Sequence, residues 1–164
     1  MHKSNLHDNI PPNLTSISTD RNILAYCSKV YDGDTIHVVY DMFDVYYSKR
    51  HMLAPRPLNG WITKSSVRLF GYDTAEVNSK DPELKSYANL ARDELAKLIL
   101  NKYVHLEIKG TDKYGRLLGV IYEETLSNIF PDYEKSINKH MASKFGKEYY
   151  GEGSKLTKSD MHKK

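Results

Sequence analysis

The sequence contains a single cysteine, Cys27, among its 164 residues. One cysteine cannot form an intramolecular disulfide, so the chain is not a disulfide-stabilised scaffold. A zinc site needs several Cys or His ligands at close spacing, and the seven histidines are scattered along the chain. Cys27 lies in the apolar run NILAYCSKV, and we interpret it as a small buried side chain.

Long hydrophobic runs are also missing. No stretch approaches the roughly 20 apolar residues that a membrane-spanning helix needs. The first residues, MHKSNLHDNIPPNLTS, have no apolar core of the kind found in a signal peptide. The default expectation is therefore an intracellular protein with no membrane partner, and we expect a monomer.

The excess of one charge sign is small. Lys and Arg number 24 and Asp and Glu 21, which gives a formal net charge of +3. This balance permits a polyanionic partner but does not require one, because proteins that bind nucleic acid through charge alone are far more basic. Tyrosine is common, with 13 residues, and the length suffices for one domain with a core.

Local composition divides the chain into three parts. The polar start, with Pro11-Pro12, predicts a flexible lead-in over residues 1–21. Residues 22–151 carry the apolar patterns and form the predicted domain. Residues 152–164 are predicted to be a polar, basic C-terminal tail.

Periodicity and turn signals predict the elements of the domain. Runs at 23–31 and 34–40 flank Asp32-Gly33, a dipeptide typical of a two-residue hairpin turn. A third strand follows at about 62–72. The clearest helix begins at Pro82, behind an Asp81 N-cap. The segments YVHLEIK and RLLGVIY are predicted to be two further strands. A second helix is predicted over about 134–145, and residues 41–61 are predicted to be an irregular excursion.

The order is three strands, a helix, two strands and a helix. Five short strands with a helix after the third predict an α+β fold, namely a five-stranded barrel of the OB type with a second helix after strand five. A fold of this kind does not by itself name a function.

Polar residues fall at the ends of the predicted strands, where they could meet at one rim of the barrel. Each alone is explained by a turn, a loop or a surface position, so only the set is informative. Two aspartates offer hard oxygens that suit Ca²⁺ or Mg²⁺, two arginines match phosphate oxygens, and a third carboxylate can act on water. Together they suit phosphodiester hydrolysis. The set is Asp34, Arg68, Asp73, Thr74, Glu76 and Arg116.

Three segments carry a resemblance to a known family. YDGDTIHV, VRLFGYDTAE and TDKYGRLLGVIY resemble, in order and rough spacing, the signature segments of the thermonuclease, or staphylococcal nuclease-like, family. The resemblance covers about residues 24–150. It implies a Ca²⁺-dependent nuclease that acts on DNA or RNA, with calcium held by Asp34, Asp73 and the backbone carbonyl of Thr74.

The same resemblance implies the remaining roles. Arg68 would hold the phosphate, Glu76 would act on the attacking water, and Arg116 would stabilise the transition state. Among the many tyrosines, Tyr114, Tyr149 and Tyr150 are candidates for stacking on bases.

Two questions stay open at this stage. The excursion at 41–61 either lies in solvent or touches substrate through Lys49, Arg50 or the Tyr46-Tyr47 pair. The alternative function is a non-catalytic module on the same barrel that binds nucleic acid or protein. A scaffold would be expected to lose the carboxylates and arginines, and this chain keeps them.

Overall fold

The barrel is formed by five strands whose apolar residues face inward. The computed structural model describes residues 21–42, 61–124, 132–148 and 156–161. Neighbouring strands pair in the order β1-β2-β3-β6-β5, and pairing between β1 and β5 closes the barrel. All pairs are antiparallel except β3 with β6, which are parallel. The strands are β1 Arg21–Val30, β2 Thr35–Asp41, β3 Ile62–Leu69, β5 Tyr103–Thr111 and β6 Leu117–Glu123.

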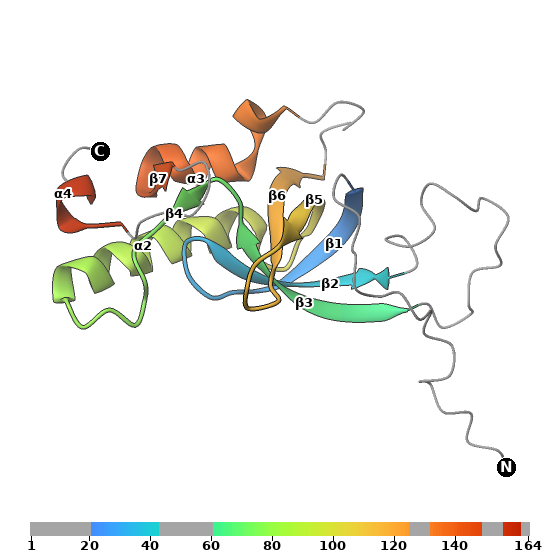
Figure 1. Ribbon diagram of the computed structural model, residues 1–164, viewed down its shortest axis with the longest axis horizontal. Helices are drawn as coiled ribbons and strands as arrows, with labels where there is room; N and C mark the ends of the chain where they lie inside the picture. The colour runs from blue at the N-terminus through green and yellow to red at the C-terminus, as the bar shows by residue number, and fades with distance from the viewer. Residues whose placement is uncertain (1–20, 43–60, 125–131, 149–155, 162–164) are drawn as a thin grey trace, which may run out of the picture.

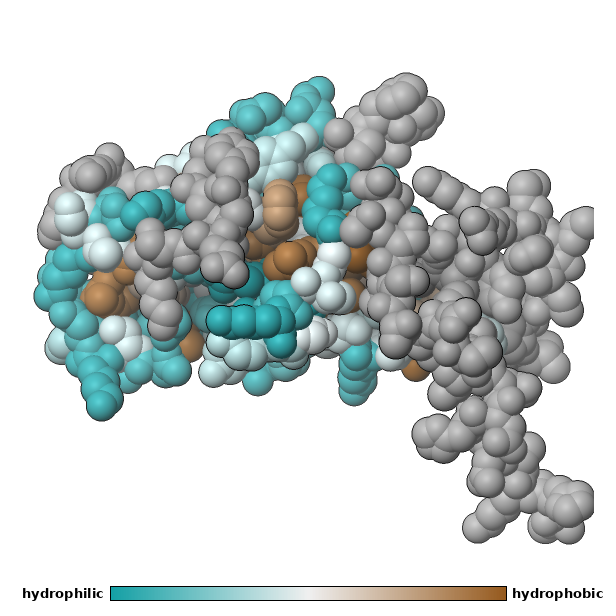
Figure 2. Space-filling model, viewed as in Figure 1, coloured by the Kyte–Doolittle hydropathy of each residue, from teal (hydrophilic) through white to brown (hydrophobic). Residues whose placement is uncertain are grey.

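This architecture confirms the predicted α+β fold with a five-stranded barrel of the OB type. Alternation along β5 shows why the prediction succeeds, since Val104, Leu106 and Ile108 are all buried. Helices gather at one end of the barrel, on the left in Figure 1. Hydrophilic residues cover much of the described surface along α2, with hydrophobic residues visible only in small groups (Figure 2).

Helix α2, Pro82–Ile99, follows the predicted pattern. The Asp81 side chain accepts hydrogen bonds from the backbone N–H groups of Glu83 and Leu84, at 3.0 and 3.3 Å, as an N-cap does. Its inner face buries Ala88, Ala91, Leu95 and Ile99. These small and branched side chains bring the helix close to the end of the barrel.

The third strand is shorter than the predicted 62–72. It ends at Leu69, because Gly71 has a backbone φ of +94°, a conformation that favours glycine and turns the chain out of the barrel. Tyr72–Asp73 then form β4, which pairs with β7, Lys147–Glu148, in a separate two-stranded sheet. The strand expected to run straight into Asp73 is therefore bent just before it.

The turn between β1 and β2 is also longer than the predicted two residues. Strand β1 ends at Val30 and β2 begins at Thr35, so residues 31–34 form the connection. Gly33 at its centre lies against α2, where an added Cβ would come within 2.7 Å of the Ala91 Cβ. Close approach to the helix, rather than a tight hairpin, explains the glycine in this turn.

The second predicted helix begins later than residue 134. A 3-10 turn, η1, covers Tyr133–Lys135, and α3 runs from Ile137 to Phe145 behind a Ser136 N-cap. Asn138, on the inner face of α3, is completely buried. Its side chain accepts the N–H of Ile121 at 2.9 Å and donates to the carbonyls of Phe70 and Gly119 at 2.8 and 2.9 Å. One amide thus joins α3 to β6 and to the bend after β3.

Residues 156–161, within the predicted tail, contact the domain. Leu156 is buried against Ala75 and Ala88. A short helix, α4, covers Lys158–Met161, and Lys158 Nζ lies 2.8 Å from a carboxylate oxygen of Asp81. None of the helices in the described ranges is long and apolar enough to cross a membrane.

Candidate active site

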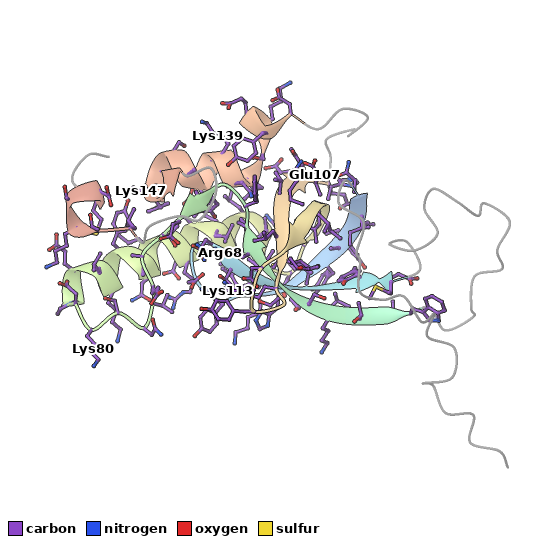
Figure 3. All side chains as sticks on the ribbon, in the orientation of Figure 1. Arg68, Lys80, Glu107, Lys113, Lys139 and Lys147 are labelled. Carbon is purple, nitrogen blue, oxygen red and sulfur yellow. The ribbon has the colours of Figure 1, made fainter. Side chains whose placement is uncertain are left out.

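An open cleft lies where β3 ends, between the turns that precede β2 and β6. Its volume is about 1050 Å³. Arg68 on β3 pairs with Thr35 of β2 on one side and with Leu118 of β6 on the other, so one turn flanks it on each side. Figure 3 shows Arg68 and Lys113, two of the lining residues, near the middle of the molecule. The predicted residues that line the cleft are Asp34, Arg68, Asp73, Thr74, Glu76, Tyr114 and Arg116.

The β1–β2 turn holds Asp34 at the base of the cleft, where it is 3% exposed. Its backbone carbonyl accepts the N–H of Leu69 at 2.7 Å. Its carboxylate accepts from the Thr35 hydroxyl at 3.0 Å and from the backbone N–H of Thr74 at 3.2 Å. Donors from two segments, at Thr35 and Thr74, therefore orient this carboxylate, and the bond from Leu69 fixes its backbone.

Arg68 bridges the two aspartates that were predicted as calcium ligands. Its Nη1 lies 3.3 Å from both carboxylate oxygens of Asp34, and its Nη2 donates to Oδ1 of Asp73. The second oxygen of Asp73 accepts the backbone N–H of Leu156 at 3.0 Å. Asp34, Arg68 and Asp73 therefore form one connected group.

Burial dominates the electrostatics of this group. Loss of solvent, with the nearby charge of Asp32, raises the pKa of Asp34 to about 7, although Arg68 acts in the opposite direction. Burial also raises the pKa of Asp73, against the hydrogen bond from Arg68. Asp34 and Asp73 share one guanidinium and Asp32 lies nearby, so an additional cation would stabilise the charged forms of these carboxylates.

The chemistry of these donors fits a hard cation. Carboxylate oxygens suit Ca²⁺, which accepts irregular oxygen geometry and completes its shell with carbonyls and water. Within the described residues, no three or more His, Cys, Asp or Glu side chains form a group that could hold a metal by themselves. A cation bound to Asp34 and Asp73 would therefore need further oxygens from backbone, water or substrate.

Thr74 and Glu76 follow Asp73 on the wall of the cleft. Thr74 is buried, and its backbone N–H points to Asp34. Glu76 is exposed, and its carbonyl accepts the N–H of Ser79 at 3.0 Å. A carboxylate in this position can reach water in the cleft. The roles assigned to both residues from the sequence stay predictions.

Asp112 organises the opposite turn. Its Oδ1 accepts the backbone N–H groups of Tyr114 and Arg116 at 2.9 and 3.0 Å. Its Oδ2 accepts the Arg116 Nε–H at 2.7 Å. Although burial acts to raise it, the bonds from Arg116 and the backbone lower the pKa of Asp112. The carboxylate thus stays charged and orients the Arg116 guanidinium in the cleft.

Sequence reasoning missed several residues of the site. The sequence marks Asp32 only as a turn residue, yet it lines the cleft, and its carboxylate accepts the Asp34 N–H at 3.2 Å. Asp112 opens a D-K-Y-G turn, a typical setting for an aspartate that bonds the backbone two residues on. Tyr31 also lines the cleft. No local signal marks the contact of Leu156 with Asp73, because 83 residues separate them.

The predicted contact residues that lie outside the described residues are Tyr46, Tyr47, Lys49, Arg50, Tyr149 and Tyr150. Their proposed contacts with substrate stay predictions.

Comparison with known proteins gives one family match. The model of the staphylococcal nuclease homologue family matches residues 66–155, which is more than half of the chain. The matched range contains Arg68, Asp73, Glu76 and Arg116, whereas Asp34 precedes it. The comparison with curated proteins finds no match.

Proposed function

Because the chain belongs to the staphylococcal nuclease homologue family, we propose that it is a calcium-dependent nuclease that hydrolyses phosphodiester bonds of DNA or RNA. The observation that carries the proposal is the cleft itself. Two buried aspartates, two arginines and an exposed glutamate converge there from four separate segments of the chain. Charged residues that serve only to keep a surface soluble have no reason to gather in one cleft.

Each residue has a role that its surroundings support. Asp34 and Asp73 would hold the cation, and members of this family are typically calcium-dependent. When bound, calcium would polarise the phosphoryl group and neutralise developing charge. Arg68 and Arg116 would bind phosphate oxygens, because the guanidinium fork matches them in pairs.

Glu76 would accept a proton from the attacking water or orient it. Its exposure on the wall of the cleft supports this role, because a general base needs access to both water and substrate. Asp112 would keep Arg116 directed at the phosphate. In this proposal the charge that develops on the phosphoryl oxygens is met by guanidinium groups that are already in place.

The alternative is a binding module without catalysis on the same barrel, since domains of this family can be non-catalytic. Such a module has no need of a general base or of a buried pair of aspartates, whose desolvation is costly. The retained set Asp34, Asp73, Glu76 and Arg116 favours the enzyme.

The deciding experiment measures hydrolysis directly. Single-stranded DNA, double-stranded DNA and RNA are each incubated with the protein and Ca²⁺, Mg²⁺ or a chelator. We expect cleavage with Ca²⁺, little with Mg²⁺, and none with the chelator, because Mg²⁺ demands a near-ideal octahedral shell. Binding without cleavage under every condition would favour the non-catalytic module. Full activity with the chelator would exclude the calcium role.

A further inference from the structure

Two exposed tyrosines lie on the two sides of Arg68. Tyr31, in the β1–β2 turn, is 46% exposed, and Tyr114, in the β5–β6 turn, is 72% exposed. The two turns flank Arg68, because this residue is paired with β2 on one side and β6 on the other. Both tyrosines line the cleft.

Each ring has a cation over it. Lys29 Nζ lies 5.7 Å from the centroid of the Tyr31 ring, and Lys113 Nζ lies 5.2 Å from that of Tyr114. Arg116 also approaches Tyr114, with its Cζ 5.7 Å from the centroid. Positive charge beside an aromatic face is the combination that binds single-stranded nucleic acid, with charge for the backbone and the ring for a base.

The backbone of both turns is fixed by hydrogen bonds. The Tyr31 N–H donates to the Thr35 carbonyl at 2.9 Å, and the Tyr114 N–H donates to Asp112 Oδ1 at 2.9 Å. A ring presented from a fixed turn loses little further freedom when it binds a ligand.

Core packing does not explain the position of Tyr31. By contrast, Tyr40 is 4% exposed with its hydroxyl 3.0 Å from Ser65 Oγ, and Tyr72 is fully buried with its hydroxyl donating to the Gly33 carbonyl at 2.7 Å. Tyr31 instead turns a large ring toward the cleft and solvent. The cleft volume of about 1050 Å³ lies just above the range of about 300–1000 Å³ for small-molecule sites.

We propose that Tyr31, with Lys29, is a second base-stacking platform, across the cleft from Tyr114, and that the two rings select an unpaired strand. This inference rests on the proposed function of the same cleft. A base inside a duplex already stacks on both neighbours, so its faces are not available to a tyrosine ring. An unpaired strand can place one base on each ring, with the phosphate between them facing Arg68.

The test measures binding rather than cleavage. Affinity for a short fluorescent single-stranded DNA is measured by anisotropy in the Glu76→Gln background with Ca²⁺, for Tyr31→Ala and Tyr31→Phe. Tyr31→Ala should weaken binding roughly 5- to 150-fold, the equivalent of about 1–3 kcal/mol for one stacked base. Tyr31→Phe keeps the ring, so its affinity for the single strand should stay within about threefold of the parent's. Affinity for duplex DNA should change less than affinity for the single strand.

A matched control is Tyr103→Ala, since Tyr103 is 53% exposed but lies outside the cleft. It should bind as the parent does. In a series of oligonucleotides that each lack one base, Tyr31→Ala should weaken binding in every case except the one in which the missing base is the base that stacks on Tyr31. Unchanged single-strand affinity in Tyr31→Ala, or an equal loss for duplex, would overturn this inference. Failure of the wild type to cleave any substrate would instead overturn the nuclease proposal, because the binding measurement does not depend on cleavage.

Discussion

Arg68 Nη1 lies 3.3 Å from each carboxylate oxygen of Asp34. The same guanidinium also reaches Asp73, so one cation opposes the rise in pKa that burial causes at both carboxylates. Removing one partner of a buried ion pair leaves an uncompensated charge, which costs more than the pair itself contributes.

We therefore predict that Arg68→Ala destabilises the protein in a pH-dependent way. The pKa of Asp34 is raised to about 7, above its ordinary value of 3.8. A raised pKa means that Asp34 disfavours folding progressively as pH rises through this window, and Arg68 limits that loss. The free energy of unfolding, measured in urea with a chelator, should fall by about 1–3 kcal/mol at pH 8. It should fall less at pH 5, where Asp34 is mostly protonated. An equal loss at both pH values would contradict this account.

A second prediction concerns the buried amide of Asn138. Asn138→Ala leaves the Ile121 N–H and the carbonyls of Phe70 and Gly119 without this partner. The Gly119 carbonyl keeps the Phe70 N–H as a donor, so two groups lose their partner. Each unsatisfied buried group costs about 1–3 kcal/mol, so we expect a total loss of about 2–6 kcal/mol in urea unfolding. His140→Ala, an exposed change on the same helix, serves as the control. A loss for Asn138→Ala no larger than that of the control would show that water replaces the amide.

The sequence predicts the barrel and α2 because both depend on local pattern. Alternation in β5 and helical spacing after Asp81 reveal which face is buried. It does not predict the bend at Gly71 or the pairing of β4 with β7, since two-residue strands carry no periodicity. Asn138 also escapes prediction, because a polar residue on a helix is normally exposed.

The residues of the candidate site also fall into those that the sequence predicts and those that it does not. Residues in the three motifs, such as Asp34 and Arg116, can be named before the fold is known. Asp32 and Asp112 lie in the same motifs but cannot be assigned to the site in this way, because each has a sufficient local explanation as a turn residue. The contacts of Asp32 with Asp34 and of Asp112 with Arg116 are local to each turn, and only the fold shows that the two turns flank Arg68 at one cleft.

The role of Glu76 is tested by Glu76→Gln. Glutamine keeps the size and can hydrogen-bond, but it cannot take a proton at pH 7. If Glu76 acts as general base, kcat should fall by about 10²–10⁴-fold with little change in KM, because the interaction matters in the transition state. Glu123→Gln, an exposed change on β6 outside the cleft, is the control. A near-normal kcat in Glu76→Gln would assign the water activation to another group.

The last prediction tests whether Asp112 affects kcat through Arg116 or independently of it. Asp112→Asn keeps one oxygen for the backbone N–H groups of the turn but loses the acceptor for the Arg116 Nε–H. The turn should therefore survive while the guanidinium loosens, and kcat should fall by about 10–100-fold, the cost of a poorly positioned group. Arg116→Ala should cost more, about 10²–10³-fold, because it removes a donor that stabilises transition-state charge. If Asp112 works through Arg116, the double variant should be no slower than Arg116→Ala alone, whereas independent effects would multiply. Asp93→Asn is the matched control, since Asp93 accepts from Arg92 in the same manner on the surface of α2. A multiplicative double variant, or an equal loss in Asp93→Asn, would show that Asp112 does not act by holding Arg116.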